Sequence, residues 1–118
     1  MLRKPTLNRV LVIGISSATA LVLAVVSFAD DAGISQLRFE RGNFAPTQLS
    51  VPANKPFKVK VINGSDTAIE FESFELHRER VVAPGETITV HMPPLAPGRY
   101  QFFDDFHHEV PKGLIVSQ

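Results

Sequence analysis

Apolar and polar residues alternate over several short runs of this chain, and this period of two is the strongest constraint on its fold. The run FKVKVIN at residues 57–63 places an apolar side chain at every second position. Because successive side chains of a strand point to opposite faces, such a run predicts a strand with one buried face. Seven or eight runs of this kind recur, separated by turn signals such as NGSD and APGE. The pattern predicts an all-β sandwich or barrel of seven or eight strands.

The start of the chain differs in character from the rest. Basic residues precede an uncharged, largely apolar run over residues 10–29, and small side chains at Ser27 and Ala29 suit a signal peptidase. We therefore expect residues 1–29 to form a signal-peptide helix that directs secretion to the periplasm, and residues 30–118 to form the domain. An uncleaved N-terminal membrane anchor is the alternative, because the run is about long enough to span a bilayer.

The composition of the expected domain argues against several classes of function. Three of the 12 basic residues fall in residues 1–29, so nine remain against 12 acidic residues, a net charge of about −3. A weakly acidic domain argues against nucleic acid as a partner, since nucleic acid requires a basic face. The chain has no cysteine, which rules out disulfide bonds and thiolate ligands. It also lacks a GxSxG motif and a phosphate-binding loop, which disfavours an ordinary hydrolase.

Two of the predicted strands end in polar residues that share the buried face. Tyr100, Phe102 and Asp104 occupy alternate positions, so Asp104 should emerge on the core side at the end of its strand. A half-buried carboxylate requires a partner, and His107 is the natural one, either directly or through a metal ion. Asn63 is in phase with the apolar residues before it, and we expect its amide to join loops through backbone hydrogen bonds.

These residues belong to motifs through which the chain resembles the cupredoxins. The motifs are FAPTQLSVPA, VIN, APGET and PGRYQFFDDFH, and they imply a cupredoxin-like Greek-key β-sandwich. In blue copper proteins the last motif reads PGxYxFxCxxH. Asp104 therefore stands where the copper-binding cysteine would be, and His107 matches the histidine. The methionine ligand has no counterpart, and Ile69, Glu70 and Glu72 occupy the region where the first histidine is expected.

Replacement of a thiolate by a carboxylate changes the ion that such a site prefers. An oxygen-rich site with one imidazole suits iron or manganese, or a copper(II) ion that does not shuttle electrons. The stretches EFESFELHRE, FFDDFH and KGLIV are similar to cysteine-free cupredoxin-like proteins that accompany bacterial high-affinity iron permeases. This resemblance implies a periplasmic protein of ferrous iron uptake, with a membrane iron permease and other periplasmic iron-uptake components as partners. It would touch the membrane only through its signal peptide or a partner.

The resemblance implies that the protein binds iron, or oxidises Fe(II), before transport. A ferroxidase reaction would need a partner or a bound copper ion as the electron acceptor, because the chain has no other redox centre. The expected cofactor is thus an iron or a copper ion.

The predicted metal ligands are Asp104 and His107, with Glu70 or Glu72 on the opposite wall. Both glutamates flank Phe71, so both face solvent if Phe71 faces the core, unless a bulge intervenes. Four further residues could support the ligands from outside the coordination sphere: Asp105, His108, Asn63 and Tyr100. The hydroxyl of Tyr100 is expected to bond a neighbouring backbone group.

Plainer roles for the same residues stay open. Asp104 and Asp105 could cap turns, and Glu75 and Glu79 are expected to be solvated charges unless one of them forms a second iron site. One alternative function is a metal-free adaptor sandwich that docks on a membrane complex, which predicts no stoichiometric metal. Another is a copper chaperone, which predicts a preference for copper(I). Its ligands would be His107, Met92 and His91.

Overall fold

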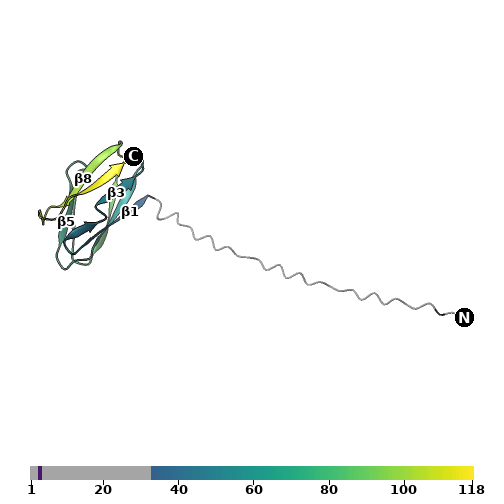
Figure 1. Ribbon diagram of the computed structural model, residues 1–118, viewed down its shortest axis with the longest axis horizontal. Helices are drawn as coiled ribbons and strands as arrows, with labels where there is room; N and C mark the ends of the chain where they lie inside the picture. The colour runs from purple at the N-terminus through teal and green to yellow at the C-terminus, as the bar shows by residue number, and fades with distance from the viewer. Residues whose placement is uncertain (1–2, 4–32) are drawn as a thin grey trace.

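The computed structural model describes Arg3 and residues 33–118, and the latter form a β-sandwich (Figure 1). Apart from Arg3, the predicted signal peptide lies outside the described residues, as does the expected domain start at Asp30. No helix in the described part is long and apolar enough to cross a membrane. The all-β prediction is confirmed, with nine strands. They are β1 (Ile34–Glu40), β2 (Asn43–Ala45), β3 (Gln48–Val51), β4 (Phe57–Asn63), β5 (Ile69–Ser73), β6 (Arg78–Val82), β7 (Thr87–Met92), β8 (Gly98–Asp104) and β9 (Gly113–Ser117).

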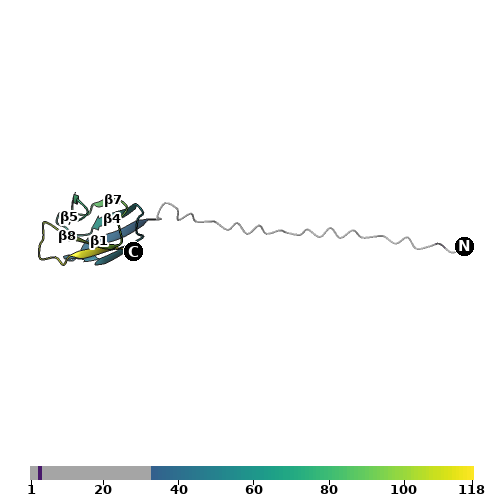
Figure 2. The ribbon, with the colours of Figure 1, turned by 90° about the horizontal axis from the view of Figure 1, so that it is seen from above.

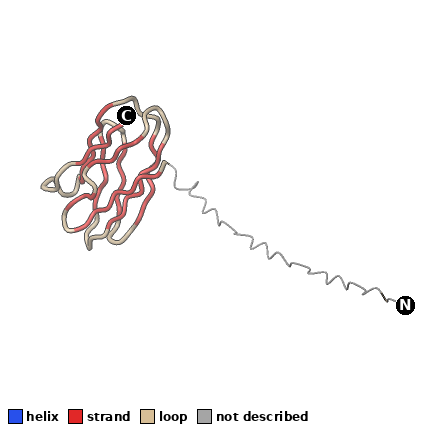
Figure 3. Tube along the Cα trace, turned by 45° about the vertical axis from the view of Figure 1, so that its right-hand side comes forward, coloured by secondary structure: helices blue, strands red, loops and turns tan. Residues whose placement is uncertain are grey.

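The strands form two mixed sheets. One sheet has four strands in the order β2-β1-β4-β7, and the other has five in the order β3-β9-β8-β5-β6. The pairs β1–β4 and β3–β9 are parallel, and the other pairs are antiparallel. Figure 2 shows the sandwich from above, and Figure 3 separates its strands from the connecting loops. Two strands that matter for the site, β5 and β8, are neighbours in the five-stranded sheet.

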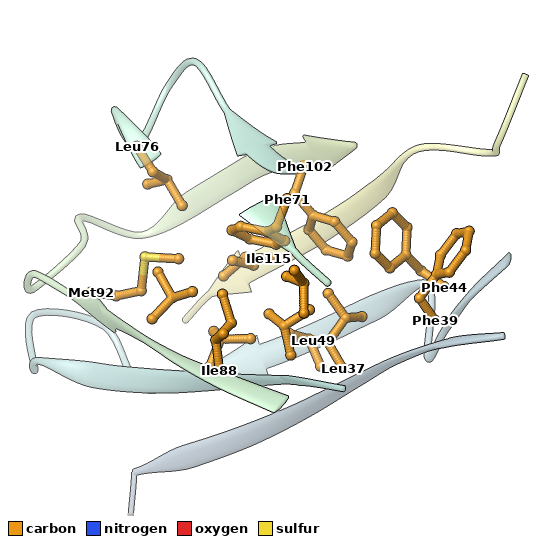
Figure 4. Packing of buried hydrophobic residues seen from close by; sticks show 14 of the residues in the cluster. Leu37, Phe39, Phe44, Leu49, Phe71, Leu76, Ile88, Met92, Phe102 and Ile115 are labelled. Atoms are coloured by element: carbon orange, nitrogen blue, oxygen red, sulfur yellow. The ribbon is translucent and has the colours of Figure 1, made fainter. Parts of the chain in front are cut away.

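The core lies between the sheets and follows the alternation in the sequence. Leu37 and Val59 of one sheet and Phe71, Phe102 and Ile115 of the other are fully buried, and Figure 4 shows side chains from both layers meeting. Full burial of such a side chain contributes about 1.5–3 kcal/mol. All buried hydrophobic residues of the described part fall between positions 37 and 115.

One glycine is required by the packing of this core. Gly113 pairs with Phe102 across β8 and β9, and the Phe102 ring covers its backbone. A Cβ atom at Gly113 would overlap that ring. The backbone of β9 therefore approaches the aromatic core more closely than any other residue type would allow.

Candidate metal centre

Asp104 ends β8 on the core side, as the strand parity predicts, and it is 1% exposed. Its Oδ1 accepts hydrogen bonds from the backbone N–H groups of Glu70, at 2.9 Å, and Phe106, at 3.0 Å. Its Oδ2 lies 2.6 Å from Nδ1 of His107. Because a carboxylate oxygen accepts, Nδ1 donates in this contact. Of the two arrangements expected for Asp104 and His107, directly bonded or joined through a metal ion, the structure shows the direct contact.

Asn63 and Tyr100 stabilise loops, as expected. The Asn63 Nδ2 donates to the carbonyls of Thr67, Val82 and Ala83 at 2.7–3.2 Å, and its Oδ1 accepts from Ser65. These bonds join the ends of strands from both sheets. The Tyr100 hydroxyl donates to the Ala96 carbonyl at 2.8 Å. No contact between either side chain and Asp104 or His107 occurs among the hydrogen bonds of the described residues.

The two candidate glutamates point away from Asp104. Phe71 is fully buried and lies opposite Asp104 in the β5–β8 pair, so Glu70 and Glu72 project from the other face of β5. The four predicted ligands therefore do not form one group. Asp104 and His107 lie on the core side of the sheet, and Glu70 and Glu72 lie on its outer face. The parity of β5 therefore correctly predicts that both glutamates face away from the core, but Glu70 does not face solvent, because it is 7% exposed.

Glu79 joins the two glutamates on that outer face. Glu72 and Glu79 are directly opposite in the antiparallel register of β5 and β6. One carboxylate oxygen from each of Glu70, Glu72 and Glu79 lies within 4.8 Å of the others. We call these three residues the outer-face trio. Glu79 is exposed, as expected, and of Glu75 and Glu79, the two residues considered for a second iron site, it is the one that joins an acidic group.

The trio is electrostatically strained. Glu70 is 7% exposed, and burial, followed by interactions with Glu79, Asp105 and Glu72, raises its pKa to about 7. Burial and the charges of Asp105 and Glu79 also raise the pKa of Glu72. None of the ion pairs of the described residues includes a member of the trio. Within the trio, a side-chain hydrogen bond between Glu70 and Glu79 contributes to the raised pKa of Glu70.

Other acidic residues near the trio have structural partners. Glu75 Oε1 accepts a hydrogen bond from the backbone N–H of Gln101 at 3.1 Å. Asp105 is anchored through its backbone N–H, which donates to the Glu70 carbonyl at 3.0 Å. The Nε2 of His108 lies 3.6 Å from Asp105 Oδ1. The residues considered as copper(I) ligands, His107, Met92 and His91, do not form one group. Met92 packs in the core and lines a cleft to which His107 does not belong.

The core-side residues do not fit a blue copper ion. Two ligand atoms bound to one ion at about 2.0–2.2 Å lie about 3.0–3.5 Å apart, so the 2.6 Å contact of Asp104 and His107 leaves no room for an ion between them. Ile69, in the region of the missing histidine, is fully buried. The next buried side chain after His107 is Val110, which offers no donor atom. Asp104 and His107 form a hydrogen bond with each other instead.

The two mixed sheets and the strand-end pair define a cupredoxin-type sandwich without a thiolate. The profile of the cupredoxin-like domain family matches residues 12–116, and the chain belongs to this family. An uncharacterized protein of Rickettsia prowazekii (strain Madrid E) is 41% identical over 73 residues, which are 62% of this chain. The match spans 58% of the length of that relative.

Three solved structures illustrate the likeness of fold. The metal-binding domain of the Cu(I)-exporting P-type ATPase of Streptococcus pneumoniae, with Cu(I), is 17% identical, with a TM-score of 0.62 over 73% of this chain and 87% of that chain. A purple cupredoxin from Nitrosopumilus maritimus is 15% identical, with a TM-score of 0.55 over 71% and 99%. Amicyanin from Paracoccus versutus is 14% identical, with a TM-score of 0.59 over 74% and 83%. Identities this low establish the fold alone.

Proposed function

We propose that this protein binds iron at the outer-face trio and acts in ferrous iron uptake in the periplasm. The observation that carries the proposal is the gathering of three carboxyl groups within 4.8 Å, none of which forms an ion pair with a basic side chain of the described residues. The iron ion is the cargo of the protein in this proposal, which a membrane iron permease and other periplasmic components receive.

The electrostatics of the trio support a bound cation. Like charges directly opposite in neighbouring strands destabilise a sheet, and Glu72 and Glu79 are such a pair. Glu70 adds a third carboxylate that is largely removed from water. The raised pKa of Glu70 shows that its ionised form is disfavoured beside the other carboxylates, and a divalent or trivalent ion would remove the repulsion and favour the ionised form.

The donor atoms of the trio select the class of ion. Carboxylate oxygens are hard donors, which suit magnesium, calcium, manganese and iron better than copper(I). Iron is favoured within this class by the resemblance of EFESFELHRE and FFDDFH to the cysteine-free proteins beside iron permeases. The proposed localisation and partners rest on the same resemblance and on the signal-peptide pattern.

Copper delivery is a second candidate function, because one solved relative is a domain of a Cu(I) exporter. Copper(I) prefers sulfur donors. The one methionine of the described residues, Met92, is 3% exposed and packs in the core. The donor set of this chain therefore supports iron over copper(I).

A metal-free adaptor is a third candidate, favoured by apolar side chains on the same face as the trio. Phe74 is 69% exposed and packs edge-on against Phe103, and Val81 lies opposite Glu70. Such a surface suits docking as well as ion binding. Stoichiometric binding of a hard ion separates the two functions.

The experiment is an anaerobic calorimetric titration of residues 30–118 with Fe(II), which measures the affinity and the number of ions bound per chain. We expect one ion per chain and at least a tenfold loss of affinity in Glu72→Gln. Glu40→Gln, which makes the same chemical change on the other sheet, should bind as the wild type does. Absence of binding, or equal affinity of Glu72→Gln and the wild type, would overturn the proposal.

A further inference from the structure

The outer face of the five-stranded sheet carries exposed apolar side chains beside the turn that joins β5 and β6. Phe74 is 69% exposed and Val81 is 53% exposed, and the register places Val81 directly opposite Glu70 on this face. The Phe74 ring packs edge-on against Phe103, with 5.0 Å between the ring centroids, and Phe103 lies opposite Glu72 in the β5–β8 pair. Large apolar side chains that gather in water on one face are typical of a protein interaction surface.

A cleft of about 310 Å³ lies beside the exposed Phe74 ring. Glu72 and Glu79 also line this cleft, and the register of β5 and β6 places them opposite each other. No ion pair of the described residues includes either of these two glutamates. Arg78 lines the cleft as well, but its guanidinium donates hydrogen bonds to three backbone carbonyls. The cleft therefore combines an exposed aromatic ring with two acidic side chains that have no basic partner in the described part of the chain.

The same face already holds one cation over an aromatic ring. The Lys112 ammonium lies 5.4 Å from the centroid of the Phe103 ring, which is within the range of a cation–π contact. Among the described residues, the Phe74 ring has no contact of this kind. A guanidinium suits the cleft beside Phe74 better than an ammonium does, because it stacks on an aromatic ring and also pairs with a carboxylate through two parallel hydrogen bonds.

We propose that this face docks a segment of another protein that inserts an arginine side chain into the cleft lined by Glu72, Phe74 and Glu79. Apolar side chains of the same segment would cover Phe74 and Val81. The charge of the cleft selects this occupant, because carboxylates repel an anionic membrane surface and nucleic acid but attract a basic segment. The inference goes beyond the proposed function, since docking of an arginine requires no metal ion.

The test is a metal-free titration of isotope-labelled residues 30–118 with a synthetic peptide, in which NMR amide shifts report the position and affinity of binding. The probe is the peptide SLSRSLS with blocked termini, and its control peptides carry lysine, glutamine or glutamate in place of the arginine. Phe74→Ser and Glu72→Gln alter the proposed surface. Ile62→Ser and Glu40→Gln make comparable changes on the other sheet and are the matched controls.

We expect amide shifts in β5, β6 and the end of β8, and affinities that fall from the arginine peptide to the lysine, glutamine and glutamate peptides. Phe74→Ser and Glu72→Gln should each weaken binding of the arginine peptide about threefold or more, because each removes a contact with the guanidinium. The two control variants should bind as the wild type does.

Three results would overturn the inference: no binding of the arginine peptide, equal affinity for the arginine and glutamine peptides, or amide shifts confined to other parts of the domain. Unchanged affinity in both Phe74→Ser and Glu72→Gln would do the same. If Phe74→Ser does not fold, Val81→Ser replaces it, because Val81 lies on the edge strand β6 and is half-exposed.

Discussion

Removal of the Asp104 carboxylate should be among the most destabilising substitutions in this protein. The carboxylate is 1% exposed and joins three groups: the backbone N–H of Glu70, the backbone N–H of Phe106 and the ring of His107. Asp104→Ala leaves the two backbone donors without an acceptor. Asp104→Asn keeps an oxygen at the Oδ1 position and loses only the charged contact with His107.

The structure gives the expected magnitudes. A buried donor that loses its acceptor costs about 1–3 kcal/mol, so two such donors and the loss of the His107 contact amount to about 3–5 kcal/mol for Asp104→Ala. Asp104→Asn should cost about 1–2 kcal/mol. A domain of this size has about 5–15 kcal/mol of stability in total, so Asp104→Ala is expected to be marginally folded.

Urea and thermal unfolding, followed by circular dichroism, measure the difference. At about 4–8 °C per kcal/mol for a domain of this length, Asp104→Ala should lower the Tm by at least about 12 °C. A loss of less than about 1 kcal/mol in Asp104→Ala would show that the carboxylate does not hold the ends of β5 and β8 together. Equal losses in the two variants would refute the argument that the backbone donors dominate.

Three further outcomes follow from particular contacts. Gly113→Ala should cost about 1–3 kcal/mol, measured by urea unfolding, because the added Cβ overlaps the Phe102 ring; a neutral effect would contradict the packing of β9. The raised pKa of Glu70, about 7 against an ordinary value of 4.5, means that the folded state holds a proton that the unfolded state releases. The contribution of the Glu70 proton to stability is therefore complete below about pH 4.5 and is lost as the pH rises through 7. Glu70→Gln should accordingly gain stability relative to the wild type over that interval. A stability difference between the two proteins that stays constant from pH 4.5 to 8 would contradict this. Fe(II) at 100 times the wild-type Kd should stabilise the wild type by about 2.7 kcal/mol in anaerobic thermal unfolding, and the same concentration should stabilise Glu72→Gln by about 1.4 kcal/mol or less.

Much of the fold could be predicted from the sequence, because the alternation of apolar and polar residues shows which face of each strand is buried. Alternation in FKVKVIN placed Asn63 in the core, and alternation before Asp104 placed its carboxylate on the buried side. The strand missed by sequence reasoning, β2, has three residues and is too short to show a period. It joins β1 through a two-residue turn at Arg41 and Gly42, where both φ angles are positive, as in a type I′ hairpin, and Gly42 is the residue of this turn that the sequence could have flagged.

The outer-face trio could be predicted only in part. The parity of β5 showed that Glu70 and Glu72 share a face, opposite to that of Phe71. The position of Glu79 depends on how β5 and β6 are joined, and β6 begins at Arg78, in a charged stretch without apolar alternation. The turn over residues 74–77, with Leu76 buried beneath it, sets the register that pairs Glu72 with Glu79. A pairing between strands is a tertiary property that the local pattern does not contain.

The most direct test of the proposed site is the position of the ion in crystals of residues 30–118 grown with Fe(II) or Mn(II), located by anomalous scattering. The proposal predicts a peak on the outer face, about 2.0–2.4 Å from carboxylate oxygens of Glu72 and Glu79, with the contact of Asp104 and His107 unchanged. A peak between Asp104 and His107, or none on the outer face at saturating ion, would contradict it.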